Sequence, residues 1–306
     1  MAHYRAACAL VLVLTAGASF AAQPTSAPTE RQILVSVLDD DGAPVPDLTT
    51  TDFEIREDDV PREVLRVEPA GDGRHVILLA DTSQAAVRAT SHIRSGLEAF
   101  VDGMHGDNEI ALVTFGGAPR ILVPATRDLE RLLEGIGEVF PRQGEAAYLL
   151  DAIDQVADGI VQRAPERPVI VAVASDGIDY SNRNARQTLD AVKESGASVY
   201  IFSLIDRRNT RANFGAFGNV DRQQIIERDM LLEQGPSESG GRHRELLASS
   251  ALERAMDELV AELRGQYLVT YSRPGALIPP ETVSVDVNRP DMDARGTPLR
   301  TQGERP

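Results

Sequence analysis

Two aspartates in this sequence follow long apolar runs. If these runs are strands of one sheet, both carboxylates lie at its edge, where they could bind a metal ion. His75–Ala80 is followed by Asp81 and, two residues later, by Ser83. A second apolar run, 168–174, is followed closely by Asp176. Carboxylate and hydroxyl oxygens are the ligands that a hard divalent ion such as Mg²⁺ prefers. Asp81, Ser83 and Asp176 are therefore candidate metal ligands, provided that the fold brings the two runs together.

The elements that must position these residues follow from the pattern of apolar residues. Uninterrupted apolar runs indicate strands that are buried on both faces of a parallel sheet, and helical spacing appears between them. The expected strands are 75–80, 109–115, 121–124, 168–174 and 198–205, and the expected helices are 93–101, 129–139, 148–161 and 184–195. This alternation predicts an α/β fold with a doubly wound, mainly parallel, Rossmann-like sheet, flanked by small β elements at both ends.

In a doubly wound sheet, ligands bind beyond the carboxyl ends of the strands. Because parallel strands present those ends at one edge, we expect Asp81 and Asp176 to converge there. The alternative is that both carboxylates only cap the ends of their strands. Ser83 has a second role open to it as the cap of the helix that follows, and this role is compatible with the first.

Smaller segments flank the predicted core, which spans 73–206. Before it, 31–70 alternates apolar and polar residues and predicts a small β domain. After it, 207–245 is rich in glycine and charge and is interpreted as an insertion. A C-terminal helix and strands at 246–290 are expected to complete the fold. The polar tail 291–306 is expected to be disordered.

The N-terminal residues have the order of a secretory signal peptide. Arg5 supplies a positive charge, an apolar run follows, and Ala21 and Ala22 offer a cleavage site. We interpret 1–22 as the signal peptide and 23–30 as a linker. The apolar run is short for a bilayer span, with an uncleaved anchor as the alternative. The expected protein is exported, periplasmic or extracellular, with no transmembrane segment after cleavage.

Composition excludes several classes of site and partner. The only cysteine, Cys8, lies in the predicted signal peptide, so the mature chain is expected to have neither a disulfide nor a thiolate metal site. The 47 acidic and 31 basic residues give a formal net charge of −16. Because such a chain repels the phosphates of nucleic acids, no nucleic-acid partner is expected.

Four motifs together resemble the von Willebrand factor A (VWA) domain. They are DTS after the first apolar strand, the IALVTF strand, the start of a helix at YLLDAI and the strand end ASDG. That family binds Mg²⁺ or Mn²⁺ at a metal-ion-dependent adhesion site and leaves one coordination position for an acidic group of a protein ligand. The resemblance assigns Asp81, Ser83 and Asp176 to this site and implies Mg²⁺ or Mn²⁺ as the cofactor.

The chain departs from the family pattern at two hydroxyl ligands. Ala85 and Ala147 stand where the resemblance expects a serine and a threonine. The site is therefore expected to be degenerate and its ion weakly held or absent, unless water or a neighbour such as Glu145 or Asp179 replaces the lost hydroxyls. Asp151 is interpreted as solvated or structural.

The flanks are similar to one branch of the family, the VWFA-related proteins that bacteria export. The similar segments are ILVSVLDDDGAPVPDLTTTDFEIRED before the core, and LVAELRGQYLVTYSRP and VSVDVNRP after it. This resemblance implies an exported module for protein–protein interaction or adhesion, which acts through the carboxyl edge of its sheet. Phe214 and Phe217, in the predicted insertion, either add to the partner-binding surface or pack back on the domain.

Two other functions stay open. One is a structural scaffold of the cell envelope that works without metal. The other is a metal-assisted hydrolase, in which the paired aspartates would activate water. Against an enzyme, the sequence has no GxSxG motif, no glycine-rich phosphate loop and no histidine spaced as a metal ligand or placed beside a candidate nucleophile. We therefore expect no catalytic activity.

Overall fold

The computed structural model describes residues 29–205, 219–275 and 280–299. The predicted signal peptide, most of the predicted linker 23–30, and both Phe214 and Phe217 lie outside these ranges. Within the described ranges, no helix is both long and apolar enough to cross a membrane.

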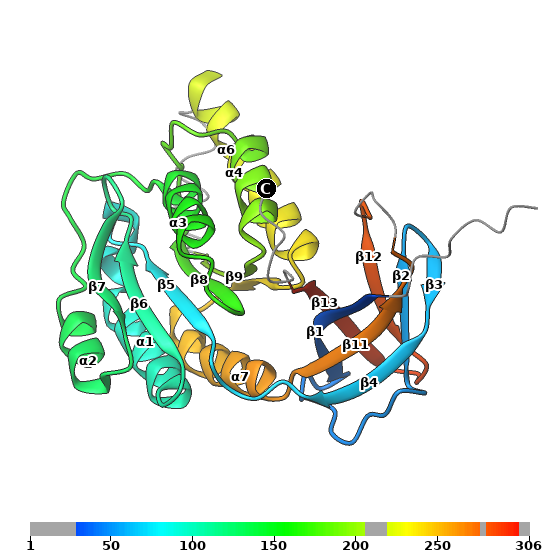
Figure 1. The fold of residues 1–306 in the computed structure, drawn as a ribbon. Coiled ribbons are helices and arrows are strands. Elements are labelled where there is room, and N and C mark those ends of the chain that lie inside the picture. The colour runs from blue at the N-terminus through cyan, green and yellow to red at the C-terminus, as the bar shows by residue number, and fades with distance from the viewer. Residues whose placement is uncertain (1–28, 206–218, 276–279, 300–306) are drawn as a thin grey trace, which may run out of the picture.

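A six-stranded sheet lies between two layers of helices in the left part of Figure 1, and we call it the central sheet. Its strands are β5 His75–Ala80, β6 Glu109–Thr114, β7 Arg120–Thr126, β8 Pro168–Ser175, β9 Ser198–Leu204 and β10 Arg242–Leu246. Their spatial order is β10-β9-β8-β5-β6-β7, and neighbours are parallel except for β6 and β7. The apolar runs that predicted β5, β8 and β9 are buried along their whole length. The predicted α/β fold with a mainly parallel sheet is confirmed.

Helices cover both faces of this sheet, which is why its central strands carry no alternating polar residues. One face is packed by α1 Thr90–Met104, α2 Leu129–Gly137 and α7 Leu252–Arg264, and the other by α3 Leu149–Arg163, α4 Ala185–Ser195 and α6 Asn219–Glu238. Two short 3-10 helices, η1 Gln84–Arg88 and η2 Ser249–Ala251, precede α1 and α7. Local signals set the ends of α4, since Asn184 and Gln187 form a capping box and Gly196 ends the helix at φ 67°.

The two flanks of the chain fold together into one β unit, seen on the right of Figure 1. Its strands are β1 Thr29–Asp39, β2 Phe53–Glu57, β3 Val60–Arg62, β4 Val64–Pro69, β11 Tyr267–Arg273, β12 Val283–Val287 and β13 Met292–Pro298. They form two sheets, ordered β13-β1-β11-β4 and β12-β2-β3. The segment 31–70 is therefore incomplete by itself, because its strands pair with strands from the other flank.

Part of the predicted insertion 207–245 belongs to the core, which corrects that interpretation. Residues 219–238 form α6, and Arg242–Leu246 forms the sixth strand of the central sheet. The sequence RHREL of β10 is polar because it is an edge strand that pairs only with β9. Polar edge strands lack the apolar run on which strand prediction depends.

The predicted disordered tail 291–306 is also wrong where the structure describes it. Met292–Pro298 forms β13, which pairs with β1 from Ile33↔Pro298 to Asp39↔Met292. The sequence MDARGTP is too polar to predict a strand. It is held by main-chain pairing with β1, whose own apolar residues supply the core beneath it.

A buried ion network joins the β unit to the central sheet, and we call this contact the junction. Glu262 of α7 is 1% exposed and pairs with Arg242 of β10 and with Arg295 of β13, each at 3.0 Å. Close by, Gln266 donates to Ser36 Oγ of β1 at 3.0 Å. The β unit is thus fixed against the central sheet by side chains from distant parts of the sequence.

Candidate functional site

The first candidate ligand, Asp81, directly follows β5 and is 1% exposed. Its Oδ1 accepts the main-chain N–H of Ser83 at 2.7 Å, and its Oδ2 accepts that of Ser175 at 2.9 Å. The second bond crosses from β5 to its neighbour β8. The structure therefore brings Asp81 and Ser83 beside the loop that carries Asp176, at the carboxyl edge of the central sheet.

Two buried hydroxyls lie at this edge. Ser83 is 1% exposed and Ser175 is 5% exposed, and neither Oγ has a hydrogen-bond partner among the described residues. Ser83 stands at the N-cap position of η1, but its side chain makes no capping bond, so the alternative role predicted for it is wrong. A buried hydroxyl without a partner is costly, which makes these two atoms notable at a candidate site.

Asp176 and Ala85 line one small cavity at the carboxyl edge. The cavity has a volume of about 350 Å³, and Arg88, Ser175 and Leu247 also line it. A Cβ added to Gly177 would lie 3.4 Å from the Ala85 methyl group, so Ala85 directly faces the loop that follows β8. The missing serine of the family pattern therefore leaves a methyl group against this loop.

The other replaced position, Ala147, is held by its main chain. It bridges Gly116 on one side and Asp179 on the other, and its carbonyl accepts the N–H of Tyr180 at 2.9 Å. Gly116 also donates to Thr82 Oγ1 at 3.0 Å. A Cβ on Gly116 would lie 2.2 Å from the Thr82 carbonyl carbon, so the loops pack here with no room for a side chain.

The neighbours considered as replacement ligands have other roles. Asp179 is 1% exposed, and its carboxylate accepts the N–H groups of Leu149 at 2.5 Å and Ser181 at 3.0 Å. Burial raises the pKa of Asp179, against the effect of these bonds. Its function is to hold the start of α3 to the loop after β8. Glu145 is exposed, its carboxylate lies beside Gly117, and its main-chain carbonyl accepts the N–H group of Gln84 at 2.9 Å.

Asp151 has the structural role expected of it. Its carboxylate accepts the main-chain N–H groups of Asn182 and Arg183 at 2.9–3.1 Å, which ties the first turn of α3 to the loop before α4.

The residues present do not fit the divalent ion that the family implies. Methyl groups occupy both replaced hydroxyl positions, at Ala85 and Ala147. Each carboxylate oxygen of Asp81 accepts one main-chain N–H group, and Ser83 Oγ has no hydrogen-bond partner among the described residues. Among the described residues, no group of three or more His, Cys, Asp or Glu side chains is arranged to hold a metal ion.

A cation that the sequence analysis missed lies at the same edge. Arg228 of α6 is 9% exposed, and it donates through Nη1 to Gly177 O at 2.5 Å and through Nη2 to Ser175 O at 3.0 Å. One signal for its burial was available. Arg228 stands three residues before Leu231, which is fully buried, so the two share a face of the helix.

A serine–histidine pair corrects the expectation that no histidine lies beside a candidate nucleophile. Ser203 Oγ and His243 Nε2 are 2.9 Å apart, on the adjacent strands β9 and β10. Because β10 was interpreted as part of an insertion, this adjacency could not be predicted. Ser203 is 1% exposed and does not line the cavity beside Asp176.

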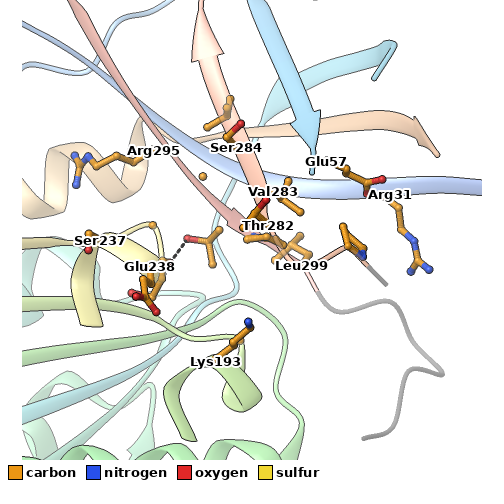
Figure 2. Close-up of a pocket in the computed structure, with 18 of the residues that line it drawn as sticks. Arg31, Glu57, Lys193, Ser237, Glu238, Thr282, Val283, Ser284, Arg295 and Leu299 are labelled. Atoms are coloured by element: carbon orange, nitrogen blue, oxygen red, sulfur yellow. Dashed lines mark hydrogen bonds between the residues drawn. The ribbon is translucent and has the colours of Figure 1, made fainter. Parts of the chain in front are cut away.

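A second, larger hollow of about 980 Å³ lies between the central sheet's helices and the β unit (Figure 2). Lys193 of α4 lines one side, and Arg31 and Glu57 of the β unit line the other. Glu57 is 2% exposed and accepts the Tyr271 hydroxyl at 2.9 Å. Its buried charge thus serves contacts within the β unit, away from the carboxyl edge.

Comparison with known proteins bears on the central sheet. The family model of the von Willebrand factor type A domain matches residues 76–178. Among curated proteins, none matches the chain. An aerotolerance-related membrane protein from Bacteroides fragilis is similar at 16% identity and a TM-score of 0.45, covering 61% of this chain and 98% of that chain.

Two further solved structures are similar. The conserved hypothetical protein BatB from Bacteroides thetaiotaomicron has 15% identity and a TM-score of 0.43, covering 62% of this chain and 98% of that chain. A von Willebrand factor type A protein from Catenulispora acidiphila has 12% identity and a TM-score of 0.48, covering 91% of this chain and 64% of that chain. The family match includes Asp81, Ser83 and Asp176 and the strands that carry them, so this chain contains a von Willebrand factor type A domain.

Proposed function

We propose that this protein is an exported binding module that recognises a protein partner through the carboxyl edge of its central sheet. It does so without catalysis and without a tightly held metal ion. VWA domains commonly mediate protein–protein interactions, and this supports the general class. Export is supported by the signal-like order of residues 1–22.

The observation that carries this proposal is that main-chain hydrogen bonds already set the edge. Asp81 ties the loop after β5 to the end of β8, Asp179 ties the loop after β8 to α3, and Gly116 packs on Thr82. An edge that is held in this way pays little conformational entropy when a partner binds. These bonds support the proposal that the loops come together without an ion.

Exposed apolar side chains give this edge a surface suited to a protein. Val87 of η1 is 43% exposed, Tyr180 in the loop after β8 is 42% exposed, and Leu247 after β10 is 61% exposed. Ser175, Asp176 and the cavity of about 350 Å³ lie among the elements that carry them. Large apolar side chains around a small polar pocket are typical of the centre of a protein interface.

Partner capture with matched variants tests the location of the site. Leu247→Asp is compared with Ile121→Asp, because both residues are 61% exposed and Ile121 lies on β7, the opposite edge strand of the sheet from β10. We expect a partner captured by the wild-type protein from a cell-envelope extract to be lost with Leu247→Asp and kept with Ile121→Asp. Loss with both or with neither variant would count against this site. A structural scaffold that uses other surfaces would give the second of these results.

Ion titration tests the second part of the proposal. An ion that binds only the native state would raise the free energy of unfolding by about 2.7 kcal/mol at a hundredfold excess over its Kd. We expect the melting temperature of the wild-type protein to be the same in EDTA as in millimolar Mg²⁺, Mn²⁺ or Ca²⁺. A rise that Asp176→Asn abolishes would show a working metal site and refute the ion-independent mode.

Export has a direct test in a bacterial host that produces the full chain. We expect the recovered protein to begin at Ala22 or Gln23, as mass spectrometry of its N-terminal peptide will show. An N-terminus at Met1 in the membrane fraction would identify an uncleaved anchor instead.

A further inference from the structure

We infer that Arg228 is the resident cation of the carboxyl edge, where its guanidinium group holds the loop after β8 and opposes the binding of a divalent ion. This inference rests on the ion-independent mode proposed above and assigns a residue to it. It concerns a side chain from α6, which lies outside the residues that match the VWA family model.

The contacts of Arg228 are directed at the loop that carries Asp176. Its two donated bonds end on the carbonyl groups of Ser175 and Gly177, the residues on either side of Asp176. Asp81 binds the same segment through the N–H group of Ser175. A buried carboxylate and a buried guanidinium thus bind the two main-chain groups of one residue, and Asp176 is held between fixed neighbours.

The charge of Arg228 acts on the acidic groups of this edge. Burial raises the pKa of Asp179 and of Asp229, the residue next to Arg228. The positive charge of Arg228 lowers both pKa values, whereas the negative charge of Asp176 raises the pKa of Asp229 further. A guanidinium group remains protonated at all ordinary pH values. A second cation placed among the same carboxylates would meet this charge at short range in a buried site, where repulsion is weakly screened.

The small residues at the edge agree with this arrangement. Ala85 presents a methyl group to the loop, 3.4 Å from where a Gly177 Cβ would lie, and Ala147, whose side chain packs against the core, bridges Gly116 and Asp179 through its main chain. A hydroxyl group at position 85 or 147 could act as a ligand only if an ion could enter the site. With the guanidinium group of Arg228 in place, the loop is already held, and a hydroxyl group at these two positions has no ligand role.

Arg74 provides a matched control at the other end of the sheet. It is 1% exposed, directly precedes β5, and donates to Leu263 O at 2.5 Å and to Gly71 O at 2.6 Å. Like Arg228, it is a buried arginine that binds main-chain carbonyl groups. Unlike Arg228, it lies at the amino ends of the strands. A purely structural effect of removing a buried arginine will therefore appear at both positions.

The experiment restores the family's hydroxyl ligands and then removes the arginine. The background is Ala85→Ser with Ala147→Thr, and Arg228→Met, Arg228→Lys or Arg74→Met is added to it. Mn²⁺ and Mg²⁺ affinities are measured by calorimetry on the full mature chain, with circular dichroism as a check of folding. Arg228→Gln serves as the second neutral variant, and it decides the question if Arg228→Met does not fold.

We expect the neutral substitution at Arg228 to tighten ion binding at least tenfold relative to the background, since a unit charge at short range in a buried site is worth about one order of magnitude or more. Arg228→Lys keeps the charge and loses the paired hydrogen bonds, so its ion affinity should stay near that of the background. Arg74→Met should lower stability and leave ion affinity unchanged.

Three results would overturn the inference. They are equal affinity with and without Arg228, equal tightening by Lys and Met, and no ion binding in the restored variant that lacks Arg228. These results are distinct from failure of the proposed function. Ion binding by the wild-type protein would refute the ion-independent mode itself, whatever the Arg228 variants do.

Discussion

The carboxyl edge and the junction both bury carboxylates, but they hold them in opposite ways. At the carboxyl edge, Asp81 and Asp179 accept main-chain N–H groups from nearby loops. At the junction, Glu262 is held by two arginine side chains, Arg242 and Arg295, from separate elements. Main-chain donors are present whatever the residue types around them, whereas side-chain partners exist only if distant positions carry the right residue.

This difference shows what each region is built to do. A carboxylate bound to main-chain groups fixes the course of a loop, whatever side chains the donor residues carry. A carboxylate bound to distant arginines specifies which two units dock and in which register. The carboxyl edge is therefore a surface with a fixed shape, and the junction is a specific contact between the central sheet and the β unit.

Breaking the junction should have the largest effect. Glu262→Gln leaves Arg242 and Arg295 partly buried without their shared carboxylate, and loss of one partner from a buried ion pair costs about 3–5 kcal/mol. We expect the free energy of unfolding in urea to fall by this amount. Glu253→Gln, at an exposed position on the same helix, should change it by less than about 0.5 kcal/mol. Equal losses from the two variants would show that the network contributes nothing specific.

Removing the carboxylate at the edge should cost somewhat less. Asp81→Ala leaves the N–H groups of Ser83 and Ser175 without their acceptor, and each buried unsatisfied donor costs about 1–3 kcal/mol. We expect a total loss of about 3 kcal/mol, measured in the same urea experiment. Ser83→Ala is the sharp control, because its hydroxyl group has no hydrogen-bond partner among the described residues. It should be neutral or stabilising, and a large loss with it would mean that Ser83 has a ligand in the purified protein.

The smallest effect should come from pH, through one buried histidine in the middle of the central sheet and one on its edge strand β10. Burial lowers the pKa of His75, at the start of β5, and of His243, on β10, below the ordinary value of 6.5. The unfolded chain therefore binds protons more readily than the folded one, and stability present above about pH 6.5 is lost as pH falls below that value.

We expect the melting temperature to fall between pH 7.5 and pH 5.5 by less than either substitution above lowers it. His243→Asn and His75→Asn should each reduce the fall. A melting temperature that rises over this interval would contradict the direction of both shifts.

Much of the fold could be predicted from the sequence, because the central strands are buried on both faces. The apolar runs of β5, β8 and β9 and the helical spacing between them are signals of local sequence. β10 and β13 could not be predicted, since both are polar edge strands. They exist because a partner strand offers main-chain groups to them, and that partner is not visible in their own residues.

The site was predictable to the same extent. Asp81, Ser83 and Asp176 stand at strand ends that a parallel sheet must bring to one edge, and the structure brings the Asp176 loop against Asp81. Arg228 was not predictable, because its role depends on where a helix far along the chain packs. Nor could the sequence show that both oxygens of Asp81 are bound to main-chain groups.

The place of β1 in its sheet has a consequence for how the molecule forms. β1 lies between β13 and β11, so a strand near the start of the described chain is completed on both sides only by strands near its end. Pairings of such long sequence separation form slowly, because closing the loop between the two strands costs entropy before the contacts form that offset this cost. The central sheet can therefore form from contacts within the intervening chain before β1 pairs with β11 and β13.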